Sequence, residues 1–510
     1  MKKILKSCVS LVLMFVVVFS FTACKKKLSD TTVDTTNVKS TNGVSTNGGM
    51  TVVCGDYLYF INGTKTNDGT SVKKNTRGAI YRVKYDIATG KVDENTYERL
   101  VTSLAGFEKD SLYVFGNFLY YAVPCEDENY KGNVLYNKIT FMRYDLAYGK
   151  SYEIYTTNQN TSGTTNYAYY IVGDSLNLVV YESADSSITS LRIGKDTTIN
   201  YVISGVTGCI LAENNGISLT AGQVDANNFV YYTTGHGSGE EIQTGVKVFR
   251  TSPVTNNSKL LSDDGESVTL LCVRNGKLVY SVGDKVYAVA ITGSESDALS
   301  FEFNNALTYA SKENVIFMEN KDGSISLLTY NTNTYALTIA RWTEGGIKLD
   351  QQTIAVLSGS TDDKFSLVGL VTLEEKVEDT SVTPPATGEG EGSEPEGQAE
   401  GEGEGEEETP VPTKIEKAQY LIYINNNIIY KIEIARENAS GEMELSKYSQ
   451  PQKLTTTKVE APTGLLVPEV IGNNLFVLAN DANSKIYMHM IDLTLDADDI
   501  EEATKIGVAE

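Results

Sequence analysis

The chain has 510 residues, of which 41% are hydrophobic, enough to bury a large core. Its 66 acidic and 43 basic residues give a formal net charge of −23, which argues against nucleic-acid binding because that needs clustered Lys and Arg. Tyr is in excess, with 31 copies against 15 Phe and 1 Trp, and its amphipathic ring suits strands with half-buried faces.

The first residues have the pattern of a targeting signal and are not expected to belong to the fold. A lysine-rich start is followed by an apolar segment, Leu11 to Phe21, which is short for a membrane span. The next residues, Thr22-Ala23-Cys24, resemble the bacterial lipobox, with Phe21 where Leu is usual. The resemblance implies cleavage after residue 23 and diacylation of Cys24, and two acyl chains are what stable anchoring requires. An ordinary secretory signal with an incidental Cys is the alternative.

This pattern predicts a lipoprotein signal peptide over residues 1–23. The protein is then expected outside the cytoplasm, lipid-anchored through Cys24 to the outer face of a bacterial cell membrane. Residues 24–49 are rich in Thr, Ser, Asn and Gly and nearly lack apolar residues, so we expect a flexible tether there.

From residue 50 to residue 510 the sequence repeats one unit, a turn former followed by an aromatic and aliphatic run. It begins as Gly55-Asp56-Tyr57-Leu58-Tyr59-Phe60 and returns as Gly116-Asn117-Phe118-Leu119-Tyr120-Tyr121. A second element, Ile80 to Asp86, returns sixty residues later as Phe141 to Asp145, with the same Tyr-Asp and the same Gly-Lys after it. Two elements that recur in the same order are typical of an all-β repeat architecture.

We predict a single β-propeller of eight four-stranded blades, with seven blades as the alternative. The runs that we take as opening strands are Tyr57–Ile61, Phe118–Val123, Leu176–Tyr181, Phe229–Thr233, Leu278–Val282, either Val315–Met318 or Ser324–Leu328, Tyr420–Ile424 and Leu475–Leu478. On this count the last repeat is about one strand short, and Val52-Val53 precedes the first opening strand. We therefore expect the amino-terminal strand to complete the last blade and close the ring.

Residues 377–413 interrupt the repeat with Pro, Gly and Glu. Ten glutamates lie between Glu389 and Glu408 with no basic residue among them, so this segment is expected to be a disordered acidic insertion. It stands where the fifth repeat has a two-residue turn, which favours a loop within one blade over a linker between domains.

Residue types that support catalysis are sparse. Only two histidines are present, His236 and His489, and neither has the paired spacing of a zinc motif. We predict no catalytic, cofactor-binding or metal-binding residue and no cofactor, although a pair of glycosidase-type carboxylates could lie among the acidic residues. Four cysteines remain after Cys8 and Cys24, namely Cys54, Cys125, Cys209 and Cys272; two disulfides are possible, and separate buried thiols are favoured.

The repeats and the lipobox together resemble the β-propeller lipoproteins of Firmicutes, whose Gly-Asp-Tyr-Leu-Tyr-Phe repeats form a ring likened to the receptor YWTD propellers. This chain lacks the Tyr-Trp-Thr-Asp tetrapeptide itself. The resemblance implies an extracellular binding or scaffolding module. We expect a monomer on the membrane that binds an envelope protein or a cell-wall glycan, and no nucleic acid. The alternatives are a propeller hydrolase acting on extracellular polysaccharide and a spacer in an envelope assembly.

Overall fold

The computed structural model describes residues 49–508 with several gaps. The gaps are residues 65–74, 106–111, 127–133, 159–162, 173–174, 212–228, 237–242, 264–267, 275–276, 283–284, 291–298, 303–314, 320–324, 332–333, 343–347, 358–364, 379–412, 439, 447–448, 460–468, 482 and 496–501. The described residues form strands and turns without a helix. Within these ranges there is accordingly no helix long and apolar enough to span a membrane.

The described strands form eight antiparallel sheets, each built from consecutive strands of the chain. Sheets 1 to 4 contain β1 (Thr51–Cys54), β2 (Tyr57–Ile61), β3 (Ile80–Asp86) and β4 (Lys91–Val101); β5 (Tyr113–Phe115), β6 (Phe118–Glu126), β7 (Val134–Asp145) and β8 (Lys150–Thr156); β9 (Thr165–Val172), β10 (Ser175–Glu182), β11 (Ser187–Ile193) and β12 (Thr198–Ser204); and β13 (Val206–Ile210), β14 (Val230–His236), β15 (Gln243–Thr251) and β16 (Lys259–Asp263).

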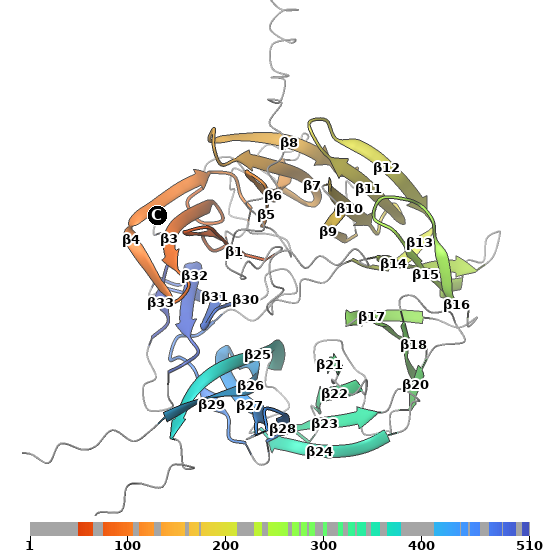
Figure 1. The fold of residues 1–510 in the computed structure, drawn as a ribbon. Helices are drawn as coiled ribbons and strands as arrows, with labels where there is room; N and C mark the ends of the chain where they lie inside the picture. The colour runs from red at the N-terminus through yellow and green to blue at the C-terminus, as the bar shows by residue number, and fades with distance from the viewer. Residues whose placement is uncertain are drawn as a thin grey trace, which may run out of the picture.

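Sheets 5 to 8 follow in the same way. They contain β17 (Val268–Arg274), β18 (Lys277–Val282), β19 (Lys285–Ala290) and β20 (Leu299–Glu302); β21 (Val315–Glu319), β22 (Ile325–Tyr330), β23 (Ala336–Trp342) and β24 (Lys348–Val356); β25 (Phe365–Glu378), β26 (Thr413–Asn425), β27 (Ile428–Glu437), β28 (Met443–Leu445) and β29 (Gln452–Lys453); and β30 (Glu469–Ile471), β31 (Asn474–Asn480), β32 (Ile486–Asp492) and β33 (Thr504–Lys505). Figure 1 shows the sheets arranged around a ring, which confirms the predicted β-propeller.

The recurring aromatic run is the second strand of every sheet, not the first as we predicted. In sheet 1 it is β2, and β1 pairs with it from Thr51↔Phe60 to Cys54↔Tyr57. The turn between them begins at Gly55, whose φ of +60° is a backbone conformation that glycine adopts without strain. The sixth sheet follows the same rule, because its second strand is β22 and not β21.

The shift by one strand also corrects the prediction about ring closure. The amino-terminal strand β1 belongs to sheet 1, and sheet 8 is completed by its own β30 and β33. Both of these strands are short, with three and two residues, so neither has an alternation that the sequence pattern could reveal. Likewise, the sequence also allows Leu112–Phe115 as a late strand of the first blade, whereas Tyr113–Phe115 begins sheet 2 as β5.

Neighbouring sheets pack face to face through apolar side chains. Between sheet 8 and sheet 1, for example, Phe60 and Leu58 lie in one buried cluster with Phe476, Leu478 and Met488. Comparable clusters of described residues join sheets 1 and 2, 2 and 3, 3 and 4, 4 and 5, 6 and 7, and 7 and 8. Burial of this apolar surface is the main source of stability in such a ring.

Sheet 1 and sheet 8 are also joined by polar contacts. The carboxylate of Glu469 on β30 is 3% exposed and accepts a hydrogen bond from the backbone N–H of Thr51 at 2.7 Å. The carboxamide of Asn62, which follows β2, accepts from the N–H of Val508 at 2.7 Å and donates to its carbonyl at 2.8 Å. The ring therefore closes through packed faces and hydrogen bonds, without a strand shared between the first and last sheets.

The strand directions define two faces of the ring. We call the face at which the first strand of each sheet begins the start face. The opposite face, at which the first strand of each sheet ends, is the arm face. Gly49 lies at the start face, where its carbonyl accepts a hydrogen bond from the N–H of Leu112 at 2.9 Å. Val508, at the other end of the described chain, is bound to Asn62 on the same face.

Candidate functional site

Cys24, which we predict to carry the lipid anchor, lies outside the described residues. Of the other cysteines, Cys54, Cys125 and Cys209 are free thiols, and the side chain of Cys272 in β17 is not described. Burial raises the pKa of the Cys54 and Cys209 thiols, so neither is a thiolate nucleophile at neutral pH.

The two histidines lie in different sheets. His236 is the last residue of β14 and pairs with Gln243, so its backbone belongs to a strand, although the glycines and serine around it predict a loop. His489 lies in the middle of β32, is 4% exposed, and has its Nδ1 3.0 Å from the carbonyl oxygen of Tyr487. Burial lowers the pKa of His489 below its usual value, so the imidazole is neutral at physiological pH.

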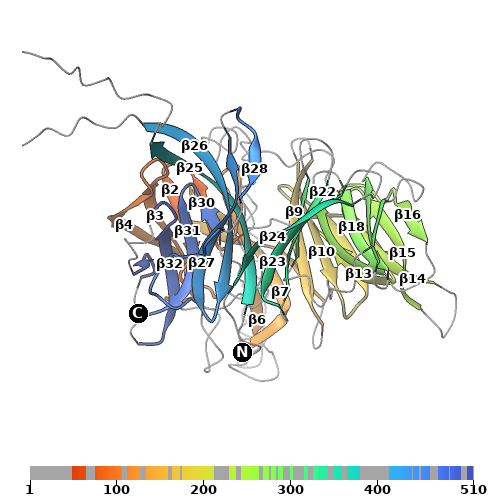
Figure 2. The ribbon, with the colours of Figure 1, turned by 90° about the horizontal axis from the view of Figure 1, so that it is seen from below.

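The most prominent polar feature of the described chain is an arm on sheet 7. Its first two strands, β25 and β26, pair from Phe365↔Asn425 as far as Glu378↔Thr413, with one bulge between Leu367 and Gly369. These strands have 14 and 13 residues and extend past the neighbouring sheets, as Figure 2 shows. We call residues 374–378 and 413–417 the arm.

Residues 379–412, outside the described ranges, connect the two strands of the arm. Because β25 and β26 are hydrogen-bonded neighbours in one sheet, the segment connects strands within a single sheet. The ladder includes Val377, Glu378 and Thr413, so the regular structure reaches into the segment 377–413 that we assigned to the insertion. The predicted disorder of the glutamate tract lies outside the described residues.

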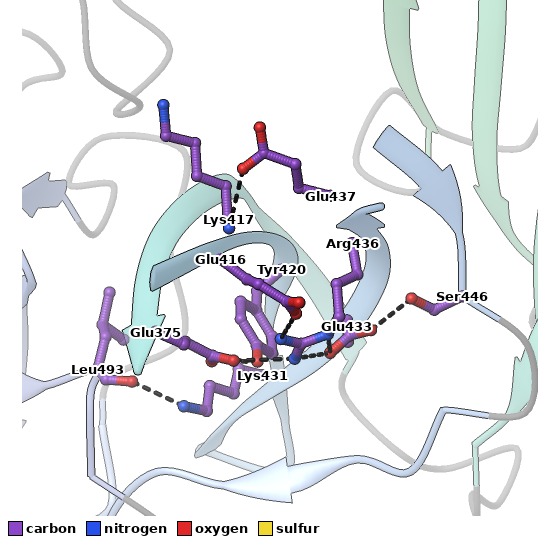
Figure 3. Close-up of polar contacts among 10 residues, drawn as sticks. All are labelled: Glu375, Glu416, Lys417, Tyr420, Lys431, Glu433, Arg436, Glu437, Ser446 and Leu493. Atoms are coloured by element: carbon purple, nitrogen blue, oxygen red, sulfur yellow. Dashed lines mark hydrogen bonds and ion pairs between the residues drawn. The ribbon is translucent and has the colours of Figure 1, made fainter. Parts of the chain in front are cut away.

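At the base of the arm, three carboxylates surround one guanidinium (Figure 3). Arg436 on β27 lies 2.8 Å from Glu375, 2.5 Å from Glu433 and 3.6 Å from Glu416, measured between guanidinium nitrogen and carboxylate oxygen. Glu375 and Glu416 are direct cross-strand partners, an arrangement that is unfavourable for like charges unless a cation lies between them. Tyr420 donates its hydroxyl hydrogen to Glu375. We call these five residues the arm cluster.

Further contacts extend the arm cluster on both sides. The hydroxyl of Ser446 donates to Glu433 at 2.5 Å, and Lys414 lies 2.8 Å from Glu416. Below the cluster, the buried ammonium of Lys431 donates to the carbonyl of Leu493 in sheet 8 at 2.7 Å and lies 5.0 Å from the centre of the Tyr420 ring. The cluster is therefore tied to the neighbouring sheet as well as to the arm.

The pKa shifts within the arm cluster follow from its ion pairs, its hydrogen bonds and burial. Hydrogen bonds from Arg436 to Glu433 and Glu375 raise the pKa of the guanidinium, and the ion pair with Lys414 lowers the pKa of Glu416. Burial, together with the hydrogen bond to Glu375, raises the pKa of the Tyr420 hydroxyl. A general acid needs a carboxyl with a raised pKa, and an activated Tyr needs a lowered one. Glu416 and Tyr420 have the opposite shifts.

The cluster is also unsuited to a metal ion, because Arg436 already supplies the positive charge among its carboxylates. Within the described ranges, no group of three or more His, Cys, Asp or Glu side chains is arranged to hold one.

The fold and this site define a β-propeller with one sheet extended into an arm. No protein-family model matches the chain, and no curated protein matches it in sequence. Solved structures similar to it include a protein from Lactobacillus plantarum and the periplasmic gluconolactonase PpgL from Pseudomonas aeruginosa. Each has 10% identity and a TM-score of 0.32 over 88% of this chain and 98% of the other. Hsv2 from Kluyveromyces lactis is 10% identical with a TM-score of 0.32, over 69% of this chain and 94% of its own. Likeness at this level carries no argument about activity, and the fold assignment rests on the eight sheets.

Proposed function

We propose that this chain is a membrane-anchored lipoprotein whose β-propeller binds a protein or a cell-wall glycan outside the cell. The observation that carries the proposal is the arm. Two-residue turns join the first two strands of sheets 1, 2 and 8. Sheet 7 instead continues its ladder for five pairs past Leu373↔Ala418.

These extra pairs contribute little to the core of the ring. Glu374 and Ile415 are each 65% exposed, so the arm buries little apolar surface that would offset the conformational entropy lost in ordering it. The arm cluster nevertheless holds the arm in one position. A projection that adds little to the core is explained by contact with another molecule better than by stability of the fold.

The arm cluster does not favour the alternative of a polysaccharide hydrolase. A glycosidase needs two carboxyl groups with different protonation states on either side of an open space for the sugar. Glu375 and Glu433 instead share the guanidinium of Arg436, at 2.8 and 2.5 Å.

The lipobox motif supports the membrane anchor, and cell fractionation tests it. The change Cys24→Ser removes the thiol that would carry the diacylglycerol, so the variant should leave the membrane fraction. If it stays in the membrane pellet through a high-salt wash, the anchor is not at Cys24.

Photo-crosslinking in intact cells tests the binding role. A photoreactive amino acid in place of Ile415, on the arm, should give discrete adducts with one envelope protein or with cell-wall fragments. The matched control is the same amino acid in place of Ala184, an exposed residue on the start face. Identical products from both positions, or none from Ile415, would contradict binding through the arm.

A further inference from the structure

The two faces of the ring differ in what is attached to them. We propose that the start face is the surface that lies against the membrane and that the arm face points away from it, toward the cell wall. This proposal rests on the anchor at Cys24 in the proposed function and adds an orientation to it.

The point at which the chain enters the fold is fixed by several contacts. Next to the carbonyl of Gly49, which accepts from Leu112, the carbonyl of Met50 accepts from the N–H of Ile61 at 3.0 Å. Thr51 is bound to Glu469 on the last sheet. A side chain at position 49 would overlap the Glu469 carboxylate, so the backbone there lies directly against sheet 8. Gly49 and the two residues after it are thus held at the start face by contacts with sheets 1, 2 and 8.

The arm is fixed equally firmly at the opposite face. The first strand of each sheet begins at the start face, so Glu378 and Thr413, at the far ends of β25 and β26, lie on the arm face. Figure 2 shows β25 and β26 rising on one side of the ring. The ion pairs of Arg436 with Glu375, Glu416 and Glu433 hold the arm there.

The expected tether is short compared with the ring, so an anchor at Cys24 would decide which face of the ring lies near the membrane. If residues 24–49 form the tether that their composition predicts, a coil of about 25 residues has a root-mean-square span of about 28 Å. A compact domain of this size has a radius of gyration of about 23 Å, so its diameter exceeds that span. A lipid at Cys24 therefore holds the start face close to the bilayer most of the time, and the arm face is on the far side of the ring.

Charge acts in the same direction. The Gly/Glu tract between Glu389 and Glu408 is joined to the ring at the arm face, and an anionic bilayer surface repels it. Lys25, Lys26 and Lys27 directly follow the anchor and are attracted to the same surface.

Energy transfer on vesicles tests the orientation. The full-length lipidated protein would carry a donor dye at Ala184→Cys on the start face or at Ala147→Cys on the arm face. Both positions are exposed residues of turns, in adjacent sheets 3 and 2. Vesicles of phosphatidylcholine and phosphatidylglycerol would contain an acceptor-labelled lipid headgroup. Protein without either substitution, treated in the same way, shows whether native cysteines take up dye.

We expect the donor at residue 184 to be quenched at least twofold more strongly than the donor at residue 147. Equal quenching, or stronger quenching at 147, would overturn the proposed orientation. The Cys24→Ser version of each labelled protein should show no quenching. Flotation separates two kinds of failure. A lipidated protein that does not float with the vesicles contradicts the anchor at Cys24, whereas one that floats and shows no difference between the two labels contradicts only the orientation.

Discussion

Glu469 is the residue on which the junction between the first and last sheets depends most. Its buried carboxylate oxygen Oε2 accepts hydrogen bonds from the backbone N–H and from the hydroxyl of Thr51, and a leucine in its place provides no acceptor. Glu469→Leu should therefore lower the free energy of unfolding by about 1–3 kcal/mol, the cost of leaving a buried polar group unsatisfied. Urea denaturation measures the loss. The control is Glu502→Leu at an exposed position near β33, where the same change should alter the free energy of unfolding by less than about 0.5 kcal/mol.

His489 gives the ring a dependence on acidity. Burial lowers its pKa in the folded state below the usual 6.5, with Lys505 acting in the same direction. As the pH falls below 6.5, the unfolded chain therefore binds a proton that the folded chain does not, and the free energy of unfolding decreases until the pH reaches the folded pKa.

Because Gln cannot bind this proton, the variant His489→Gln should lose less stability than the wild type between pH 7.5 and pH 5. The difference between the two losses should be roughly 1 kcal/mol for each unit by which the pKa is lowered. The urea midpoints of both proteins at the two pH values provide the measurement. Parallel decreases in the two proteins would show that His489 binds a proton in the folded ring as readily as in the unfolded chain, which contradicts a lowered pKa.

Within sheet 7, Arg436 determines whether the arm keeps its position. Arg436→Gln would leave Glu375, Glu416 and Glu433 without their shared cation, and we expect a loss of about 1–2 kcal/mol. Since the remaining carboxylates repel one another only when ionised, the loss should shrink as the pH is lowered below about 4.5.

The matched control is Arg82→Gln, because the Arg82 guanidinium pairs with one carboxylate, the half-exposed Glu98, and otherwise contacts tyrosines such as Tyr57. That pair is worth less than about 1 kcal/mol. Thermal unfolding of both variants at neutral and acidic pH makes the comparison. A loss for Arg436→Gln that matches Arg82→Gln, or that does not depend on pH, would contradict the role of the arm cluster.

The strands show which elements could be predicted from the sequence. Long strands with an aromatic pattern, such as β2, β6 and β26, were found because their side chains alternate or are buried throughout. The strands β30 and β33 have too few residues to show a period, and missing them displaced the boundary of every repeat by one strand. The number of repeats did not depend on that boundary, so the prediction of eight blades agrees with the eight described sheets.

The arm cluster could not be predicted in the same way. Glu375 and Arg436 are 61 residues apart in sequence, on either side of the insertion. Their contact depends on the register of β25 with β26 and on a bulge between Gln419 and Tyr420 that shifts β27. The one available signal is the density of Glu and Lys on both flanks of the glycine and glutamate tract. For charged residues of a solvated strand, the sequence does not show which residues pair with them.

At the scale of the whole molecule, closure of the ring is the property on which the other conclusions depend. The eight sheets follow one another without a shared strand, so the last junction relies on apolar packing between β2 and β31 and on the hydrogen bonds of Glu469 and Asn62. Closure also sets the polarity of the molecule, because β1 fixes the point where the chain enters the fold at the start face, while sheet 7 holds the arm at the other face.

The most direct test of this closure is limited proteolysis of two truncated proteins side by side. Removing residues 29–48 leaves β1 and its bonds to Glu469 in place, so this protein should resist protease as well as the full chain does. Removing residues 29–55 deletes β1, exposes the edge of β2 and leaves the Glu469 carboxylate without Thr51, so this protein should be cleaved rapidly. Equal resistance of the two truncated proteins would contradict a junction between sheets 1 and 8 that depends on β1 and its bond to Glu469.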